Sequence, residues 1–119
     1  MARKTDDDAP SQRRQPPLEG FQRKYLRGLV HGVQPIVQVG QQGITEAVMA
    51  AIARALTDHE LIKVRLGQNF EGDRHEAGDA IAAATGARVV QVIGRVIVLF
   101  RARPRDKKDT RPRIELPRG

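Results

Sequence analysis

The sequence contains no cysteine and no tryptophan, and only four of its 119 residues are aromatic. Without cysteine, disulfide bonds, zinc–thiolate sites and cysteine nucleophiles are excluded. No stretch approaches the roughly 20 apolar residues that a membrane-spanning helix needs. Residues 1–17 are polar and lack the apolar segment of a secretory signal. We therefore expect a soluble, cytoplasmic protein that does not associate with a membrane.

Residue types that carry catalysis are also scarce. Ser11 is the only serine, and it lies in the polar N-terminal segment, so the sequence does not support a serine nucleophile with a histidine partner. The three histidines, His31, His59 and His75, form no metal-binding pattern, and there is no phosphate-binding P-loop. These absences predict a protein that is not an enzyme and that uses no metal, no cofactor and no small-molecule substrate.

The formal net charge is +7, and most of the surplus lies near the C-terminus, where residues 101–119 hold eight basic and three acidic residues. Such a segment either binds polyanions in a salt-dependent way or simply keeps the protein in solution. The charged, proline-containing segment 1–17 has too few large apolar residues to form a core. We expect a disordered arm over 1–17, a folded domain over 18–101, and a basic, mostly flexible tail over 102–119.

Hydrophobic periodicity places seven elements between the two tails. In chain order they are a helix over 18–31, a strand over 36–39, a helix that Thr45 caps, a strand over 61–66, a helix over 73–85, and strands over 89–93 and 96–100. Gly94 and Arg95 fit a two-residue hairpin turn between the last two strands. The pattern predicts an α/β fold of two layers, in which helices pack on one four-stranded mixed sheet in the order α-β-α-β-α-β-β.

The first helix has an apolar side and a basic side. We expect its apolar side, with the two aromatic residues Phe21 and Tyr25, to belong to the core. Arg23, Lys24 and Arg27 fall on the other side. They are either an ordinary solvated helix face or a surface that meets phosphate groups.

The turn Gly40-Gln41-Gln42-Gly43 lies between a predicted strand and a predicted helix. Two glycines three residues apart allow a ligand to approach the main chain, and the helix that follows adds free N–H groups and a positive dipole end. A turn of this kind can hold a phosphodiester backbone, or it can be a simple connection. Elsewhere, Lys63 and Arg65 lie two residues apart on one predicted strand and therefore share a face. This face is either an RNA surface or a solvated one. Arg95 and Arg101 are further candidate RNA contacts.

Taken together, five segments make the stretch 18–101 resemble the CRM domain (chloroplast RNA splicing and ribosome maturation), especially its small stand-alone bacterial form. These segments are 25–31 (YLRGLVH), 35–45 (PIVQVGQQGIT), 59–64 (HELIKV), 85–86 (TG), and 90–95 (VQVIGR) running into 98–101 (VLFR). The end of the tail, IELPR over 114–118, also looks like the end of the bacterial proteins.

The resemblance implies RNA binding. Bacterial members associate with precursors of the large ribosomal subunit, plant members act in group II intron splicing, and the family fold resembles the C-terminal domain of translation initiation factor 3. The implied RNA surface is the turn Gly40-Gln41-Gln42-Gly43 with Arg23, Lys24 and Arg27. Many family members have a lysine in this turn, whereas both middle residues here are glutamine. We therefore hypothesise that the basic tail compensates for a weaker turn.

The sequence thus predicts a monomeric protein that binds large-subunit ribosomal RNA in pre-ribosomal particles and assists ribosome assembly. Binding would be led by the backbone and shape of the RNA, because the aromatic residues are assigned to the core. Two alternatives remain open. One is an accessory subunit of a splicing or RNA-processing complex, and the other is an adaptor that binds proteins through the sheet face.

Overall fold

The computed structural model describes residues 17–33, 36–40, 42–104, 108–111 and 113–117. Apart from Pro17, the expected N-terminal arm lies outside these residues. The elements are α2 (Gly20–Leu29), the 3₁₀ turn η2 (Val30–Gly32), β1 (Ile36–Val39), α3 (Glu46–His59), β2 (Leu61–Leu66), α4 (Arg74–Thr85), β3 (Arg88–Ile93) and β4 (Val96–Phe100). The predicted α/β fold and its element order are confirmed.

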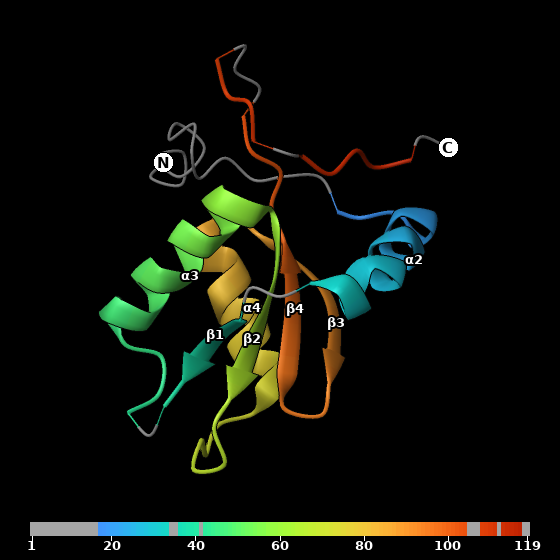
Figure 1. Ribbon diagram of the computed structural model, residues 1–119. Helices are drawn as coiled ribbons and strands as arrows, with labels where there is room; N and C mark the ends of the chain where they lie inside the picture. Colours follow the sequence, from blue (N-terminus) through green and yellow to red (C-terminus); the bar gives the residue numbers. More distant parts are fainter. Residues whose placement is uncertain (1–16, 34–35, 41, 105–107, 112, 118–119) are drawn as a thin grey trace, which may run out of the picture.

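The four strands form one mixed sheet in the order β1-β2-β4-β3. β1 runs parallel to β2, whereas β2 and β3 each run antiparallel to β4. The edge strands are therefore β1 and β3. Because β1 and β2 are parallel, the loops that follow them leave the sheet at the same end, and the β3–β4 hairpin turns at that end too (Figure 1).

Each face of the sheet carries its own hydrophobic cluster. On one face α3 and α4 bury Ile52, Leu56, Ala77 and Ile81 against the sheet. On the other face α2 lies near β3, and Leu18, Leu26 and Val30 pack with residues of β2, β3 and β4. The sheet with α3 and α4 gives the two layers expected, and α2 covers part of the opposite face (Figure 1).

The two aromatic side chains of α2 depart from the expectation. Phe21 and Tyr25 are each 42% exposed, and within α2 only Leu26 is buried. The prediction that both rings belong to the core is therefore wrong. The physical reason is that α2 rests on the sheet along a narrow strip, so part of its apolar side remains in solvent.

The helix and turn signals of the sequence act as expected. The Thr45 hydroxyl accepts a hydrogen bond from Val48 N–H at 3.1 Å and caps α3. Asp73 caps α4 by accepting from His75 and Glu76 N–H, and these bonds lower the pKa of Asp73. Gly86 ends α4 with a φ of 80°.

The C-terminal tail, in its described parts, is bound to the domain through Glu60, whereas the sequence predicts a mostly flexible segment. Glu60 follows α3 with a φ of 68° and is fully buried. Its carboxylate accepts hydrogen bonds from Arg103 N–H at 2.7 Å and from Ile114 N–H at 2.6 Å. Ile114 and Leu116 then pack on the α2 cluster. A buried carboxylate requires such partners, and here the tail supplies them.

Charged side chains strengthen this attachment. Arg103 donates to the carbonyls of Thr57 and Asp58 at the end of α3, where cations are favoured. Arg111 forms an ion pair with Asp109 at 2.8 Å and another with Asp58 at 3.2 Å. The hydrogen bonds from Arg111 hold the pKa of Asp109 well below its usual range. Several tail cations are therefore engaged within the protein.

Candidate nucleic-acid interface

The glycine turn between β1 and α3 is closed by its own main chain. Gly43 N–H donates to the Gly40 carbonyl at 3.1 Å, and Thr45 N–H donates to the Gly43 carbonyl at 3.1 Å. Gly43 has a φ of 78°, so the backbone itself favours glycine there. A ligand must use main-chain N–H groups other than these two, such as those that the first turn of a helix leaves free.

Gly40 is different, because the fold does not require glycine at this position. Its φ lies outside the left-handed region, and an added Cβ would meet no atom within 4 Å. The residue is exposed. Because Gly40 has no side chain, the main chain is open there, and a ligand can approach it closely.

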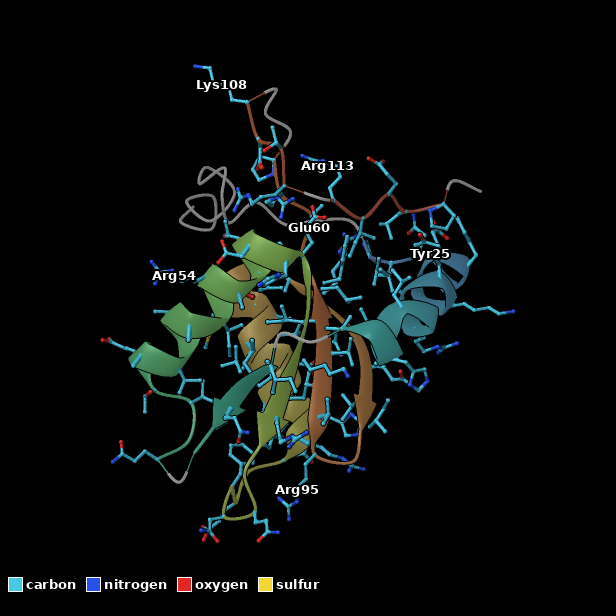
Figure 2. All side chains as sticks on the ribbon, viewed as in Figure 1. Tyr25, Arg54, Glu60, Arg95, Lys108 and Arg113 are labelled. Carbon is cyan, nitrogen blue, oxygen red and sulfur yellow. The ribbon has the colours of Figure 1, made fainter. Side chains whose placement is uncertain are left out.

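Arg95 lies close to the base of this turn. Gly67 N–H donates to the Val39 carbonyl at 2.9 Å, and the Arg95 guanidinium donates to the Gly67 carbonyl, also at 2.9 Å. A Cβ on Gly67 would lie 3.0 Å from the Val39 oxygen, so a side chain would crowd the close approach of the two strand ends. The hairpin therefore brings Arg95 to the same end of the sheet as the glycine turn (Figure 2).

The basic residues of α2 lie elsewhere. Arg23 is half-buried, and Lys24 and Arg27 are exposed, but α2 packs beside β3 while the glycine turn follows β1 at the opposite edge of the sheet. Figure 1 shows the turn and α2 well separated. The turn and the basic residues of α2, expected to form one surface, therefore lie apart among the described residues, because the strand order separates them.

Lys63 and Arg65 lie between these two regions. Side chains two residues apart on a strand share a face. Leu61 belongs to the α2 cluster, so Lys63 and Arg65 lie on the same sheet face as α2. Arg65 is exposed and pairs in register with Gln38, two residues before Gly40. Within the described part of the chain, neither cation has an ion-pair or hydrogen-bond partner.

Arg101 has a structural role. Its guanidinium donates to the Thr85 carbonyl at 2.7 Å, to the Ala53 carbonyl at 3.1 Å and to the Thr57 hydroxyl at 2.7 Å. It thereby links the C-terminal half of α3 to the last turn of α4, and burial lowers its pKa. With its donors engaged in this way, Arg101 is left out of the surface considered below.

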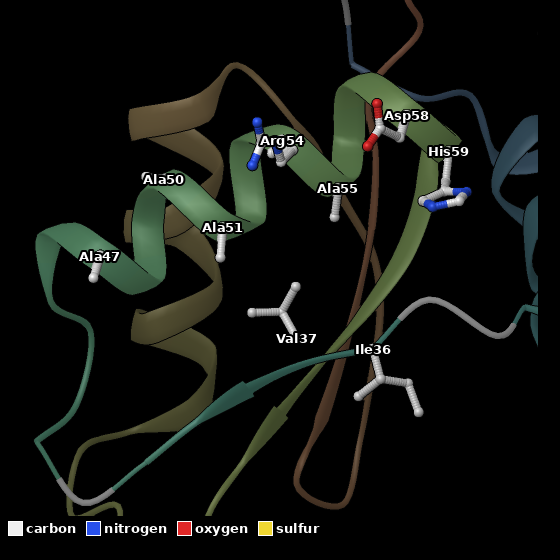
Figure 3. A pocket seen from close by; sticks show the side chains of 9 residues that line it. All are labelled: Ile36, Val37, Ala47, Ala50, Ala51, Arg54, Ala55, Asp58 and His59. Carbon is white, nitrogen blue, oxygen red and sulfur yellow. The ribbon is translucent and has the colours of Figure 1, made fainter.

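A separate apolar hollow of about 690 Å³ lies between β1 and α3. Ala51 and Ala55 point from α3 toward Ile36 and Val37, whereas Arg54 and Asp58 point away from β1 (Figure 3). The small alanine side chains leave this space beside an edge strand. Its lining suits an apolar partner better than phosphate groups.

Two further classes of site were sought over the described residues. In that part of the chain, no three side chains of the metal-binding types gather in one place. None of its helices has both the length and the apolar character needed to span a bilayer. The candidate surface that the described residues offer is an open one, made of the glycine turn and the cations Lys63, Arg65 and Arg95.

The sequence of the folded domain matches one known family. The model of the CRS1/YhbY (CRM) domain matches residues 18–101. The chain belongs to this family.

Individual relatives span nearly the same length. The chain is 38% identical over 100 residues to the probable RNA-binding protein YqeI of Bacillus subtilis, covering 84% of this chain and 99% of the relative. It is 39% identical over 101 residues to an RNA-binding protein of Haemophilus influenzae, covering 85% and 96%. The solution structure of SAV1595 from Staphylococcus aureus aligns with a TM-score of 0.67 at 41% identity, covering 84% and 99%.

Sequence reasoning placed neither Arg65 nor the loop that follows β2 close to the glycine turn. The missing information was that β1 and β2 are parallel neighbours. Once that pairing is known, the carboxyl ends of both strands must lie together, and so must the loops that follow them. Single-sequence periodicity identifies strands but does not pair them.

Proposed function

We propose that this protein binds RNA on a surface that runs from the Gly40–Gly43 turn and Arg95, across Lys63 and Arg65, to the outer side of α2. We call this surface the basic track. The observation that carries the proposal is that Lys63 and Arg65, on the sheet face between the turn and α2, have no ion-pair or hydrogen-bond partner among the described residues. The names of the relatives, which state RNA binding, support it.

Each part of the track has its own task. The open main chain at Gly40 and the first turn of α3 hold the sugar–phosphate backbone. Lys63, Arg65 and Arg95 neutralise phosphates and release counterions. On α2, the exposed Phe21 and Tyr25 rings offer surfaces on which unpaired bases stack, which the sequence did not lead us to expect.

The salt dependence of binding tests this track. We expect Arg65→Gln to weaken binding to a large-subunit ribosomal RNA fragment and to reduce the slope of log Kd against log salt by roughly one. Arg54→Gln, an exposed arginine on α3, is the matched control and leaves the slope unchanged. Fluorescence anisotropy over a salt series measures both. Equal slopes for the two variants and the parent protein would remove the track from consideration.

The cellular partner in this proposal is ribosomal RNA in precursor large subunits, as the resemblance to the small bacterial CRM proteins implies. Crosslinking in cells followed by sequencing of the bound RNA, together with sedimentation against ribosomal fractions, tests it. We expect large-subunit sequences in pre-ribosomal particles. Recovery with a splicing or RNA-processing complex instead would favour the accessory-subunit alternative.

The apolar hollow beside β1 favours a second candidate function, an adaptor that binds a protein. An edge strand next to an apolar space can accept an extended peptide. Ala51→Arg would fill the hollow without changing the basic track. If this variant kept its RNA affinity in vitro but lost its association with ribosomal particles, the adaptor function would be supported.

A further inference from the structure

A polar groove lies at the end of the sheet that carries the glycine turn. It has a volume of about 630 Å³ and lies between that turn and the loop after β2. Figure 1 shows the two loops leaving the sheet at the same end. The groove is lined by Gln42, Gly43, Gln68, Asn69, Phe70 and Glu71.

The lining has an unusual chemical composition for a site on a basic surface. Three carboxamides and one carboxylate face the groove, and no cation lines it among the described residues. These four side chains are exposed, and within the described residues none of them has a hydrogen-bond partner. A phosphate group would be repelled by Glu71, so the groove suits a different part of a nucleic acid.

Carboxamides and carboxylates match the edges of nucleobases. Asparagine and glutamine pair with a donor and an acceptor at once, and a carboxylate accepts from an exocyclic amino group. The half-buried Phe70 ring adds an apolar wall. Uracil fits least well, because two carbonyl oxygens flank its single N–H and both are repelled by Glu71.

The position of the groove relative to the turn makes this chemistry usable. Gly43 belongs both to the turn and to the groove lining. A strand whose backbone lies on the turn can therefore direct one unpaired base into the groove. We propose that the groove binds an unpaired nucleobase that carries an exocyclic amino group, with Glu71 as the acceptor. This inference rests on the proposed RNA binding and names what the track recognises.

The test compares short single-stranded oligonucleotides of adenine, cytosine and uracil by anisotropy. We expect the parent protein to bind the adenine and cytosine oligonucleotides at least about five-fold more tightly than the uracil one. Glu71→Gln should reduce this ratio toward one, because glutamine can both donate and accept. Glu76→Gln makes the same charge change on the exposed first turn of α4 and should keep the ratio.

Gln68→Ala provides a second variant that keeps the net charge. We expect it to weaken adenine binding several-fold while urea unfolding stays unchanged. Equal binding of all three oligonucleotides by the parent protein, or an unchanged ratio in Glu71→Gln, would overturn the groove proposal alone. If the parent protein bound the ribosomal RNA fragment but none of the three oligonucleotides, the groove proposal alone would also be overturned. If it did not bind the fragment either, the proposed function would be overturned as well.

Discussion

At the scale of single residues, Glu60 combines two costs that a protein normally avoids. A φ of 68° strains a residue that has a side chain, and a buried carboxylate loses its hydration. Two main-chain N–H groups of the tail offset the second cost. The sequence gives no sign of this, because both partners lie more than 40 residues away along the chain.

Two substitutions at Glu60 separate these contributions. Glu60→Ala keeps the strain and removes the carboxylate, and we expect it to lower the free energy of unfolding by about 2–4 kcal/mol. Glu60→Gly also removes the carboxylate but relieves the strain, so it should be more stable than the alanine variant by about 1 kcal/mol. Urea unfolding measures both values. An alanine variant as stable as the glycine variant would show that the backbone is not strained.

Gly40 allows a test of ligand approach without a change in folding. Because an added Cβ meets open space, Gly40→Ala should change the free energy of unfolding by less than about 0.5 kcal/mol. It should nevertheless weaken RNA binding, since the methyl group keeps phosphates away from the main chain. Gly20→Ala, where an added Cβ also meets no neighbour, is the control. Unchanged RNA affinity in Gly40→Ala would mean that the turn is only a connection.

At the scale of elements, α2 shows what periodicity can and cannot predict. The helical spacing of its apolar residues is confirmed, and Leu26 is buried as expected. The area of the sheet face against which α2 packs depends on the sheet, and the spacing of residues within α2 does not predict it. The spacing therefore predicts Phe21 and Tyr25 in the core, although the structure leaves both of them partly in solvent.

Their exposure predicts the effect of removing them. Tyr25→Ala should cost less than about 1.5 kcal/mol of stability, whereas Leu26→Ala should cost about 2–5 kcal/mol. If bases stack on this ring, Tyr25→Ala weakens binding to single-stranded RNA while Tyr25→Phe does not. Thermal unfolding and anisotropy on the same samples provide the comparison. Equal RNA affinity in the parent protein, Tyr25→Ala and Tyr25→Phe would restrict the basic track to the sheet and the turn.

At the scale of the whole molecule, the strand order determines which candidate residues meet. The elements, the Thr45 cap and the Gly86 terminus could all be predicted, because each depends on near neighbours in the chain. The separation of α2 from the glycine turn could not, because it follows from β1 and β3 forming opposite edges. The same long-range pairing brings the loop after β2 beside the turn.

The tail contact predicts a dependence on pH. The pKa of Asp109 in the folded protein lies below its ordinary value of 3.8, because Arg111 donates hydrogen bonds to the ionised carboxylate. Its stabilising contribution is therefore complete above pH 3.8 and is lost progressively as the pH falls below it. Methyl NMR signals of Ile114 and Leu116 should report this loosening. In Asp109→Asn this contribution is already absent at neutral pH. The change of the Ile114 and Leu116 methyl signals at low pH should therefore disappear.

Removal of residues 103–119 tests the two roles of the tail together. The truncation removes both partners of the Glu60 carboxylate, so we expect a lower midpoint of urea unfolding. The hypothesis that the tail compensates for a neutral turn predicts weaker RNA binding with a flatter salt slope. The matched variant Glu60→Gly in the full chain keeps all the tail cations. If it shows the same loss of RNA affinity, the tail acts through stability rather than charge.

The distance along the chain between Glu60 and Ile114 also has a consequence for synthesis. Ile114 follows Glu60 by 54 residues, so a ribosome reaches it roughly 3–10 s later. During that interval the Glu60 carboxylate and the part of the α2 cluster that Ile114 and Leu116 cover remain exposed to water. The nascent domain therefore acquires its full stability late, after the C-terminal segment with Ile114 and Leu116 has been synthesised.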